Sequence, residues 1–372
     1  MVKRDSERIK KLSVILEEAG IDYLVVLDEV NIKYLAGNPI DYSLVYLDVK
    51  EGTVNGLVNI MEAERASQVT WLDGIYVYLR PQTQYDGGYE AVRGDNLYDA
   101  LSKVLTKGRI GIPFDRITHK QYLQLIEALG RELIDATEYL WKARKIKTRF
   151  ELEMMSKSGE LVDFGIHKAI TLSKEGVTEK EIADNVKCEM FKYGADRVFD
   201  FLIVASGLNS ANPHWRASNK KLEVGDPITF DFVASIDGYF GDETRTVFLG
   251  EPKDELKKIY EIVLEAQVAA VDAVEPGVKT SEVDEVARKI IEKAGYGKYF
   301  IHSTGHGIGL EVHEPPRLST TDETVIEEGM VLTVEPGIYI QGLGGVRIED
   351  MVYVDKSGVR VLTKLNKAYT II

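Results

Sequence analysis

The sequence predicts an α+β fold of two domains: an α/β domain over residues 1–139, and a second domain with an internal repeat over residues 140–372. Three observations support this. The 372-residue chain exceeds the ~250–300 residues at which a single core stops growing. Helix and strand patterns alternate up to about residue 135. Beyond that point, two pairs of helical patterns are each followed by a hairpin that carries two acids.

The first domain opens with an amphipathic helical pattern that ends near Gly20. Four strand patterns follow (IDYLVVL, SLVYLDV, GLVNI and GIYVYL), and then a helix around YLQLIEALG. We identify no catalytic constellation in this part of the sequence. We therefore expect the chemistry to lie in the second domain.

Composition excludes several classes of partner and location. A formal net charge of −14 disfavours nucleic acid and anionic membranes as partners. The single cysteine, Cys188, excludes an internal disulfide, and its helical setting predicts a small buried apolar residue. No signal-peptide core is present, and no apolar run approaches the ~18–20 residues of a membrane span. We therefore expect a cytoplasmic protein that does not bind membranes.

The second domain repeats a helix pair and a hairpin. Capping boxes at Thr148–Glu151 and Thr178–Glu181 open two helices. The segment EGVTEKEIADNV (175–186) resembles PGVKTSEVDEVA (276–287), and each joins two helical patterns. This repetition predicts an approximate internal two-fold.

Each hairpin carries two acids within an apolar run. Asp237-Gly238 is a strong signal for a two-residue turn, which places Asp231 opposite or diagonal to Asp242, within ~4.5–8 Å at Cβ. In the second hairpin, Glu335 and Glu349 are equally distant along the chain from Gly342, in the loop QGLGG (341–345). Four converging carboxylates cannot all ionise without counter-charge, and one or two divalent cations would supply it.

Histidines gather beside these acids. The segment IHSTGHGIGLEVHEPP carries three of them, His302, His306 and His313. The pair His313-Glu314 is not a zinc-protease helix motif, because two prolines follow it directly. Carboxylates with imidazoles suit Mn, Co, Fe or Zn. A pair of such ions would bridge a hydroxide and polarise a carbonyl, which is the equipment for amide hydrolysis.

These motifs closely resemble those of the pita-bread metallopeptidases, and within them the prolidase and aminopeptidase P group. The family pattern is matched by Asp231 in FDF, Asp242 in GDETRT, His306 in TGHGIG, Glu335 in VEPGIY and Glu349 in VRIED. The resemblance covers residues 140–372 and implies a pita-bread fold with a pseudo-two-fold repeat. Residues 1–135 match in general character the creatinase-type amino-terminal domain of this group.

The resemblance also implies a cofactor, two divalent metal ions per chain (Mn, Co, Zn or Fe). Asp231 would bind one ion and His306 the other. Asp242 and Glu349 would bridge them. Glu335 would bind metal and act as the general base toward the bridging hydroxide.

Further roles follow from the same resemblance. His214, in the segment ASGLNSANPH, and His313 would contact the scissile carbonyl and the tetrahedral intermediate. Arg347 would orient a bridging carboxylate from outside the metal cage. His302 and Tyr339 would line the pocket.

The resemblance predicts a prolidase, a hydrolase that cleaves the Xaa-Pro bond of dipeptides. Arg317, four residues after His313, would bind the free carboxylate of a dipeptide. Two alternatives stay open: an aminopeptidase P acting on longer peptides, and a non-catalytic pita-bread interaction protein. The family also implies a homodimer in which one chain's first domain overhangs the other chain's pocket, and the loop 38–44 is the candidate overhang.

Overall fold

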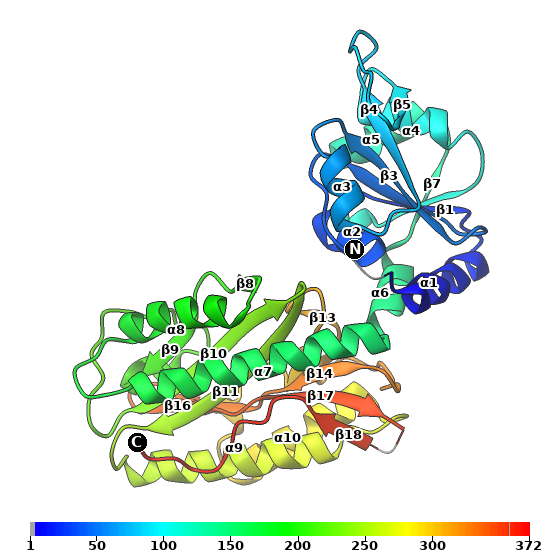
Figure 1. The fold of residues 1–372 in the computed structure, drawn as a ribbon. Coiled ribbons are helices and arrows are strands. Elements are labelled where there is room, and N and C mark those ends of the chain that lie inside the picture. The colour runs from blue at the N-terminus through cyan, green and yellow to red at the C-terminus, as the bar shows by residue number, and fades with distance from the viewer. Residues whose placement is uncertain (1–3, 357) are drawn as a thin grey trace. The chain divides into compact units, whose positions relative to one another are not determined.

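The computed structural model describes residues 4–356 and 358–372 (Figure 1). The chain forms two compact units, of which the first ends at Arg144 and the second begins at Lys145. The boundary expected between residues 139 and 140 falls inside helix α6 (Thr137–Lys145). Across the two described ranges, no helix combines the length and apolar character that crossing a membrane requires.

The first unit is built on a seven-stranded mixed sheet. The strands lie in the order β5-β4-β3-β2-β1-β6-β7, and β2 is antiparallel to both of its neighbours. The strands are β1 (Tyr23–Val26), β2 (Leu44–Asp48), β3 (Thr53–Asn59), β4 (Gly74–Leu79), β5 (Glu90–Arg93), β6 (Ile110–Ile112) and β7 (Leu133–Asp135). The helices are α1 (Ser6–Glu18), α2 (Glu29–Ala36), α3 (Ala63–Val69), α4 (Leu97–Val104), η1 (Phe114–Arg116) and α5 (His119–Leu129).

The second unit has two helix pairs, as the repeat predicted. The first pair is α7 (Arg149–Leu172) and α8 (Glu179–Tyr193), and the second is α9 (Asp254–Asp272) and α10 (Thr280–Lys293). Both predicted capping boxes are formed, at the starts of α7 and α8. Helix α7 packs against β10 and β11, whereas α9 packs against β14, β15 and β16. The strands thus lie between the two helix pairs (Figure 1).

The strands of the second unit fall into three sheets. Their orders are β11-β10-β8, with β9 also pairing with β10, then β13-β12-β14-β17-β18, and β15-β16. The first sheet contains β8 (Arg197–Val198), β9 (Ile203–Ser206), β10 (Pro227–Ile236) and β11 (Tyr239–Phe248). The others contain β12 (Gly305–Gly307), β13 (Glu314–Leu318), β14 (Val331–Val334), β15 (Gly337–Ile340), β16 (Gly344–Arg347), β17 (Asp350–Asp355) and β18 (Gly358–Val361). Two 3-10 turns, η2 (Gly207–Ala211) and η3 (Gly297–Tyr299), connect elements.

Each half of the second unit has its own apolar core. One cluster joins α7 and α8 to β10, around Val162, Val186 and Phe230. The other joins α9 and α10 to β14 and β17, around Val263 and Leu332. Burial of apolar side chains is the main stabilising term in folding, so each helix pair fixes its own hairpin in place.

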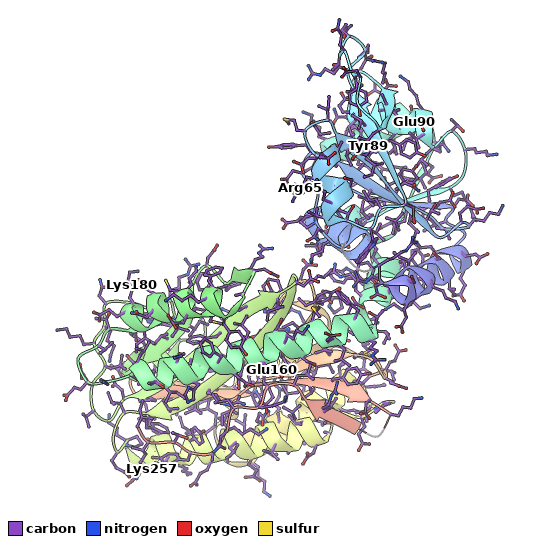
Figure 2. The ribbon with its side chains drawn as sticks, viewed as in Figure 1. Arg65, Tyr89, Glu90, Glu160, Lys180 and Lys257 are labelled. Atoms are coloured by element: carbon purple, nitrogen blue, oxygen red, sulfur yellow. The ribbon has the colours of Figure 1, made fainter. Side chains whose placement is uncertain are left out.

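Polar residues cover the outer faces of the helices. Glu160 on α7 and Lys180 on α8 are both exposed (Figure 2). Lys180 pairs with Asp184 one helical turn later, at 2.8 Å. Exposed pairs of this kind contribute little stability, so these faces mainly keep the helices hydrated.

Cys188 is exposed, and the prediction that it would be buried is wrong. The buried stripe of α8 runs through Ile182, Val186 and Met190 at a spacing of four residues. Position 188 falls between two members of that stripe and points away from the core.

Candidate metal centre

The first pair of acids lies on a continuous hairpin formed by β10 and β11. The φ values at Asp237 and Gly238 are 48° and 74°, and a type I′ turn requires positive φ at both positions. In the resulting register Val233 opposes Asp242. Two residues along β10, Asp231 lies on the same face and therefore sits diagonal to Asp242. Of the two placements expected from the sequence, the diagonal one is found.

The second pair of acids lies where a hairpin ladder is interrupted. Strands β14 and β17 pair on one side of the gap, and β15 and β16 pair on the other in the same register. Glu335 and Glu349 oppose each other between these ladders. Pro336 follows Glu335 and has no N–H to donate, which helps to break the ladder here.

The two hairpins are joined to each other. The backbone N–H of Glu349 donates to the carbonyl of Thr244 at 3.0 Å, and the Thr244 hydroxyl donates to the Glu349 carboxylate at 2.7 Å. Two residues away, the Thr246 hydroxyl donates to the carbonyl of Arg347 at 2.9 Å. These bonds bring the acids of both hairpins into one cluster.

Asp242, Glu349 and His306 form the centre of this cluster. All three are buried, and each offers one ligand atom within 4.8 Å of the others. His306 comes from β12, where its Nδ1 lies 3.0 Å from the carbonyl of Gly307. If Nδ1 carries the proton, Nε2 is free to bind a cation, and Nε2 lies 3.9 Å from Asp242 and 3.3 Å from Glu335.

The cluster carries more negative charge than its imidazole balances. Burial raises the pKa values of Asp242 and Glu349 well above the usual range, and repulsion from neighbouring acids raises them further. Burial also opposes the charged form of His306, but the contact with Glu335 prevails and raises the pKa of His306 to about 8. The same contact outweighs burial at Glu335 and lowers its pKa to about 2.

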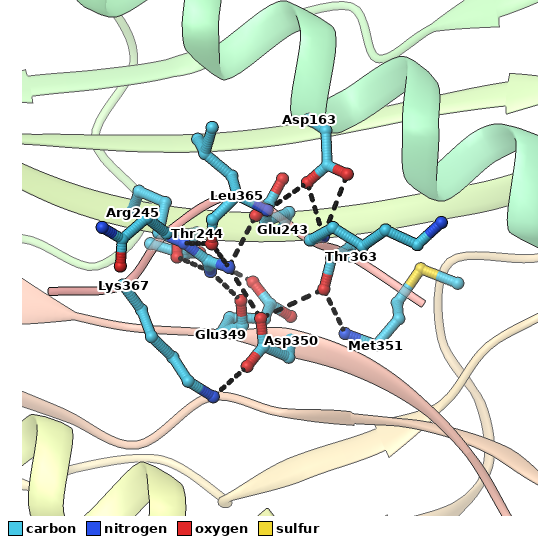
Figure 3. A network of polar contacts seen from close by, with 12 residues as sticks. Asp163, Glu243, Thr244, Arg245, Glu349, Asp350, Met351, Thr363, Leu365 and Lys367 are labelled. Atoms are coloured by element: carbon cyan, nitrogen blue, oxygen red, sulfur yellow. Dashed lines mark hydrogen bonds and ion pairs between the residues drawn. The ribbon is translucent and has the colours of Figure 1, made fainter. Parts of the chain in front are cut away.

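On the reverse face of the hairpins, opposite to Asp242 and Glu349, basic side chains lie beside the buried acids (Figure 3). Arg245 donates to Asp350 at 2.7 Å, lies 2.8 Å from Glu243, and donates to the backbone carbonyl of Glu349. Lys367 donates to the second carboxylate oxygen of Asp350 at 2.6 Å. Burial raises the pKa of Asp350, but Arg245 and Lys367 outweigh it and hold the pKa below its usual range.

The two faces therefore differ in the source of their counter-charge. On the reverse face, Arg245 and Lys367 neutralise Asp350, whereas at Glu243 burial outweighs Arg245 and raises the pKa well above its usual range. On the front face, the donors that converge are carboxylate oxygens and one imidazole nitrogen, a set that fits a divalent ion such as Mn, Co, Zn or Fe.

Asp231 is held at the edge of the cluster by a hydrogen-bonded chain. Arg347 donates to Asp231 at 2.5 Å and to the Tyr339 hydroxyl at 2.8 Å. The Tyr339 hydroxyl lies 2.9 Å from Nε2 of His302. Arg347 was expected to orient a bridging carboxylate. It donates directly to Asp231, and its Nε donates at 3.1 Å to the Thr244 hydroxyl, which in turn donates to Glu349.

The two histidines predicted to be catalytic are both exposed, but they have different neighbours. The ring of His313 lies edge-on to that of His306, with 4.4 Å between ring centroids. Burial, and then repulsion from His306, lower the pKa of His313 to about 4, so this ring is neutral near pH 7. His214 is exposed in the loop between η2 and β10, and it contributes to the electrostatic environment of Asp231.

Arg317 lies on β13. This strand also contains the two prolines that follow His313-Glu314, so the segment is a strand and not a helix. It is exposed, and its backbone N–H donates to Asp322 at 2.8 Å. It lines a surface hollow with Ser319, Thr321, Asp322, Glu323 and Thr324. Its charge contributes to the lowered pKa of His313, so Arg317 belongs to the surroundings of the cluster.

Two threonines of the site were missed from the sequence. Thr244 bonds Glu349, and the Thr333 hydroxyl accepts from the backbone N–H of His306 at 3.1 Å. Thr244 lies two residues after Asp242, on the same face of β11, so strand alternation alone would have identified it.

Known proteins match both units. Residues 153–356 match Metallopeptidase family M24, and residues 8–146 match the Creatinase/Prolidase N-terminal domain. The chain belongs to metallopeptidase family M24. This confirms the predicted combination of a creatinase-type α/β domain with a pita-bread metallopeptidase domain.

M24 relatives resemble the chain over nearly its full length. The Xaa-Pro dipeptidase of Pyrococcus furiosus is 38% identical over 97% of this chain and 99% of its own. The structure of the Xaa-Pro dipeptidase of Bacillus anthracis matches with a TM-score of 0.87 and 37% identity, over 98% of this chain and 99% of that one. An X-Pro aminopeptidase of Thermotoga maritima matches with a TM-score of 0.85 and 34% identity, over 96% and 99%.

Proposed function

We propose that this protein is a metal-dependent Xaa-Pro dipeptidase. The observation that carries the proposal is the buried cluster of Asp242, His306 and Glu349, built from two linked hairpins in a chain of family M24. M24 relatives named Xaa-Pro dipeptidase, alike over almost the whole chain, supply the substrate class.

The cofactor we propose is two divalent metal ions per chain. Their ligands would be Asp231, Asp242, His306, Glu335 and Glu349. When bound, such ions polarise the scissile carbonyl and make a water molecule acidic enough to attack it near neutral pH. Mn, Co, Zn and Fe are all compatible with this donor set.

Side chains of the protein would then carry the proton and bind the peptide. Glu335 would accept the proton of the attacking water through a carboxylate oxygen. The neutral ring of His313 donates an N–H toward the oxygen of the scissile carbonyl, and His214 approaches that oxygen from its loop. Arg317 binds the free carboxylate of the dipeptide.

A comparison of peptide lengths tests this function. Metal-free protein is loaded with Mn, Co or Zn, and its rates on Xaa-Pro and Xaa-Pro-Yaa are measured. A dipeptidase cleaves the first much faster than the second. A preference for the tripeptide would instead make the protein an Xaa-Pro aminopeptidase, the activity named for the Thermotoga maritima relative. If the fully metal-loaded protein hydrolysed neither peptide, that result would support the non-catalytic alternative.

Our proposal includes a homodimer in the cytoplasm. A reducing compartment suits a chain whose single cysteine is exposed. Tyr42, in the candidate overhang loop 38–44, is 78% exposed and has a φ of 52°, so the loop presents its aromatic ring to solvent at some conformational cost. Light scattering that gives the mass of one chain would refute the dimer, and cell fractionation checks the location.

A further inference from the structure

Glu179 is a buried carboxylate that the proposed chemistry does not use. It is the first residue of α8, and its side chain is fully buried. The segment it contacts, residues 206–218, connects β9 to the region before β10 and carries His214. Ser206 is the last residue of β9, and after it the described segment has no regular structure apart from the turn η2. Something other than a strand ladder must therefore fix its conformation.

The carboxylate of Glu179 accepts six hydrogen bonds from this segment. One oxygen accepts from the backbone N–H and the hydroxyl of Ser206, both at 2.8 Å, and from the side-chain amide of Asn209 at 2.9 Å. The other accepts from the indole of Trp215 at 2.9 Å, and from the N–H and hydroxyl of Ser218 at 3.0 and 2.7 Å. One ionised side chain thus ties both ends of the segment.

The ionised form is the one that this arrangement requires. A carboxylate has about four lone-pair sites and no proton to donate, and hydrogen bonds to a charged group are stronger than neutral ones. Burial opposes ionisation, yet the donors outweigh it, and the pKa of Glu179 is lowered.

The far side of the segment contacts the second hairpin. The Ser210 hydroxyl accepts from the N–H of Gly345 at 2.8 Å. Arg347, which holds Asp231, also donates to the carbonyl of Pro213 at 3.3 Å. His214 therefore lies between Pro213, which is fixed by the site, and Trp215, which is fixed by Glu179.

Helix capping does not explain Glu179. The start of α8 is capped by Thr178 and Glu181, which form a complete capping box. Glu181 is exposed, whereas Glu179 is buried and points into the loop. The two acids, two residues apart, have separate tasks.

We infer that Glu179 is a positioning residue for catalysis: its carboxylate holds the segment 206–218 so that His214 reaches the scissile carbonyl. The inference rests on the proposed function for the role of His214. The contact between Glu179 and the segment can also be measured without any activity.

The test compares Glu179→Gln with Glu181→Gln. Glutamine in place of Glu179 keeps the shape but turns an NH₂ group toward three donors, so we expect kcat to fall about 10- to 100-fold, with the metal content unchanged. Glu181→Gln is the matched control, because glutamine fills this capping position in α5. It should change kcat less than twofold.

A double-mutant cycle with His214→Ala separates positioning from general damage. If Glu179 acts through His214, the pair Glu179→Gln and His214→Ala should be no slower than His214→Ala alone. Additive losses in kcat would overturn the inference, as would a normal kcat in Glu179→Gln. Should Glu179→Gln fail to fold, Ser218→Ala removes a single hydroxyl donor and enters the same cycle with a smaller expected loss.

Amide hydrogen exchange makes the result independent of the enzyme assay. Exchange at Ser206 and Ser218 should accelerate in Glu179→Gln and stay normal in Glu181→Gln. Unchanged exchange in Glu179→Gln would refute the clamp, that is, the set of hydrogen bonds by which Glu179 holds the segment 206–218. If the wild type cleaves no Xaa-Pro peptide while the exchange result holds, the proposed function fails and the clamp stands as a structural feature.

Discussion

The two halves of the pita-bread domain bring acids to one cluster by different backbone routes. In the first half, ten-residue strands pair without a break from Pro227–Phe248 to Ile236–Tyr239. In the second half the ladder breaks, and Glu335 and Glu349 lie in the gap. On a continuous strand, the residues of one face recur at every second position. In the gap of the second half, the carboxylate of Glu335 lies 3.3 Å from Nε2 of His306.

The residues that anchor the histidine-bearing loops also differ between the two halves. In the first half, Glu179 holds the histidine-bearing segment. In the second, Asp284 on α10 accepts from the N–H and hydroxyl of Thr304 at 3.0 and 2.8 Å, between His302 and His306, and also binds Arg288. Both acids are fully buried. The internal two-fold is thus preserved in the helix pairs and the cluster acids, while the hairpin ladders and the residues that anchor the loops differ between the halves.

The largest effect should come from removing one central acid of either half. Asp242→Ala and Glu349→Ala should each lower kcat/KM by about 10⁴-fold or more, as when a member of a catalytic unit is lost. Metal content per chain should fall in both, because each acid is proposed to bind both ions. Metal analysis and rates on Xaa-Pro check this. A variant that kept two metals and normal turnover would show that the halves do not share the ions.

The next largest effect should come from the histidines. His214→Ala in the first half and His313→Ala in the second should each lower kcat by ~10²–10³, the scale for losing one donor to a developing oxyanion. Metal content should stay at the wild-type level. Loss of metal from His214→Ala would mean that the first half contributes a ligand that we assign to catalysis.

The threonines offer a finer comparison. Thr244 donates to Glu349 at 2.7 Å, whereas Thr333 donates to Glu335 at 3.4 Å, a much weaker geometry. Thr244→Val should weaken metal binding by about 10- to 100-fold, and Thr333→Val should weaken it less. Competition with a chelator measures both. Equal losses would mean that Glu335 depends on its threonine as much as Glu349 does.

The smallest effect concerns acid stability. Near neutral pH the wild type should exceed Glu179→Gln in free energy of unfolding by about 1–3 kcal/mol, because buried donors lose their acceptor. The pKa of Glu179 is lowered in the folded state, so the unfolded chain takes up the proton first as pH falls. The difference is complete above the unfolded pKa of about 4.3 and shrinks as pH falls through the folded pKa.

Urea unfolding of both variants at several pH values measures this difference. Glu181→Gln, at an exposed position of the same helix, serves again as the control. A gap between wild type and Glu179→Gln that stayed constant down to pH 3 would contradict the charged clamp.

Sequence reasoning recovered the parts of the site that local patterns encode. The Asp-Gly turn fixes the first hairpin, and acids inside apolar runs mark the inward face, so Asp231 and Asp242 were placed correctly on one face. Both capping boxes were predicted correctly because each is a pattern of four consecutive residues. Local pattern alone did not identify Glu179, because its partners lie 27 to 39 residues along the chain.

Other features depended on side-chain geometry that a pattern does not contain. The guanidinium of Arg347 reaches Asp231 on the other hairpin, 116 residues away, and is linked to Glu349 only through the Thr244 hydroxyl. Cys188 was predicted to be buried because it is small and apolar. The buried stripe of α8 contains Val186 and Met190 instead, and Cys188 lies between them in sequence on the exposed side of the helix.

The continuous register of the first hairpin restricts how this enzyme can evolve. Side chains of a strand alternate between faces, so one residue inserted or deleted within β10 after Asp231, or within β11 before Asp242, would turn one acid toward the core of its own half. Changes in the length of these strands should therefore disrupt the cluster, whereas single substitutions at residues next to the two aspartates need not do so. Loops between the halves are free of that constraint, so lineages of this enzyme should diverge in length there and keep the spacing of these two aspartates fixed.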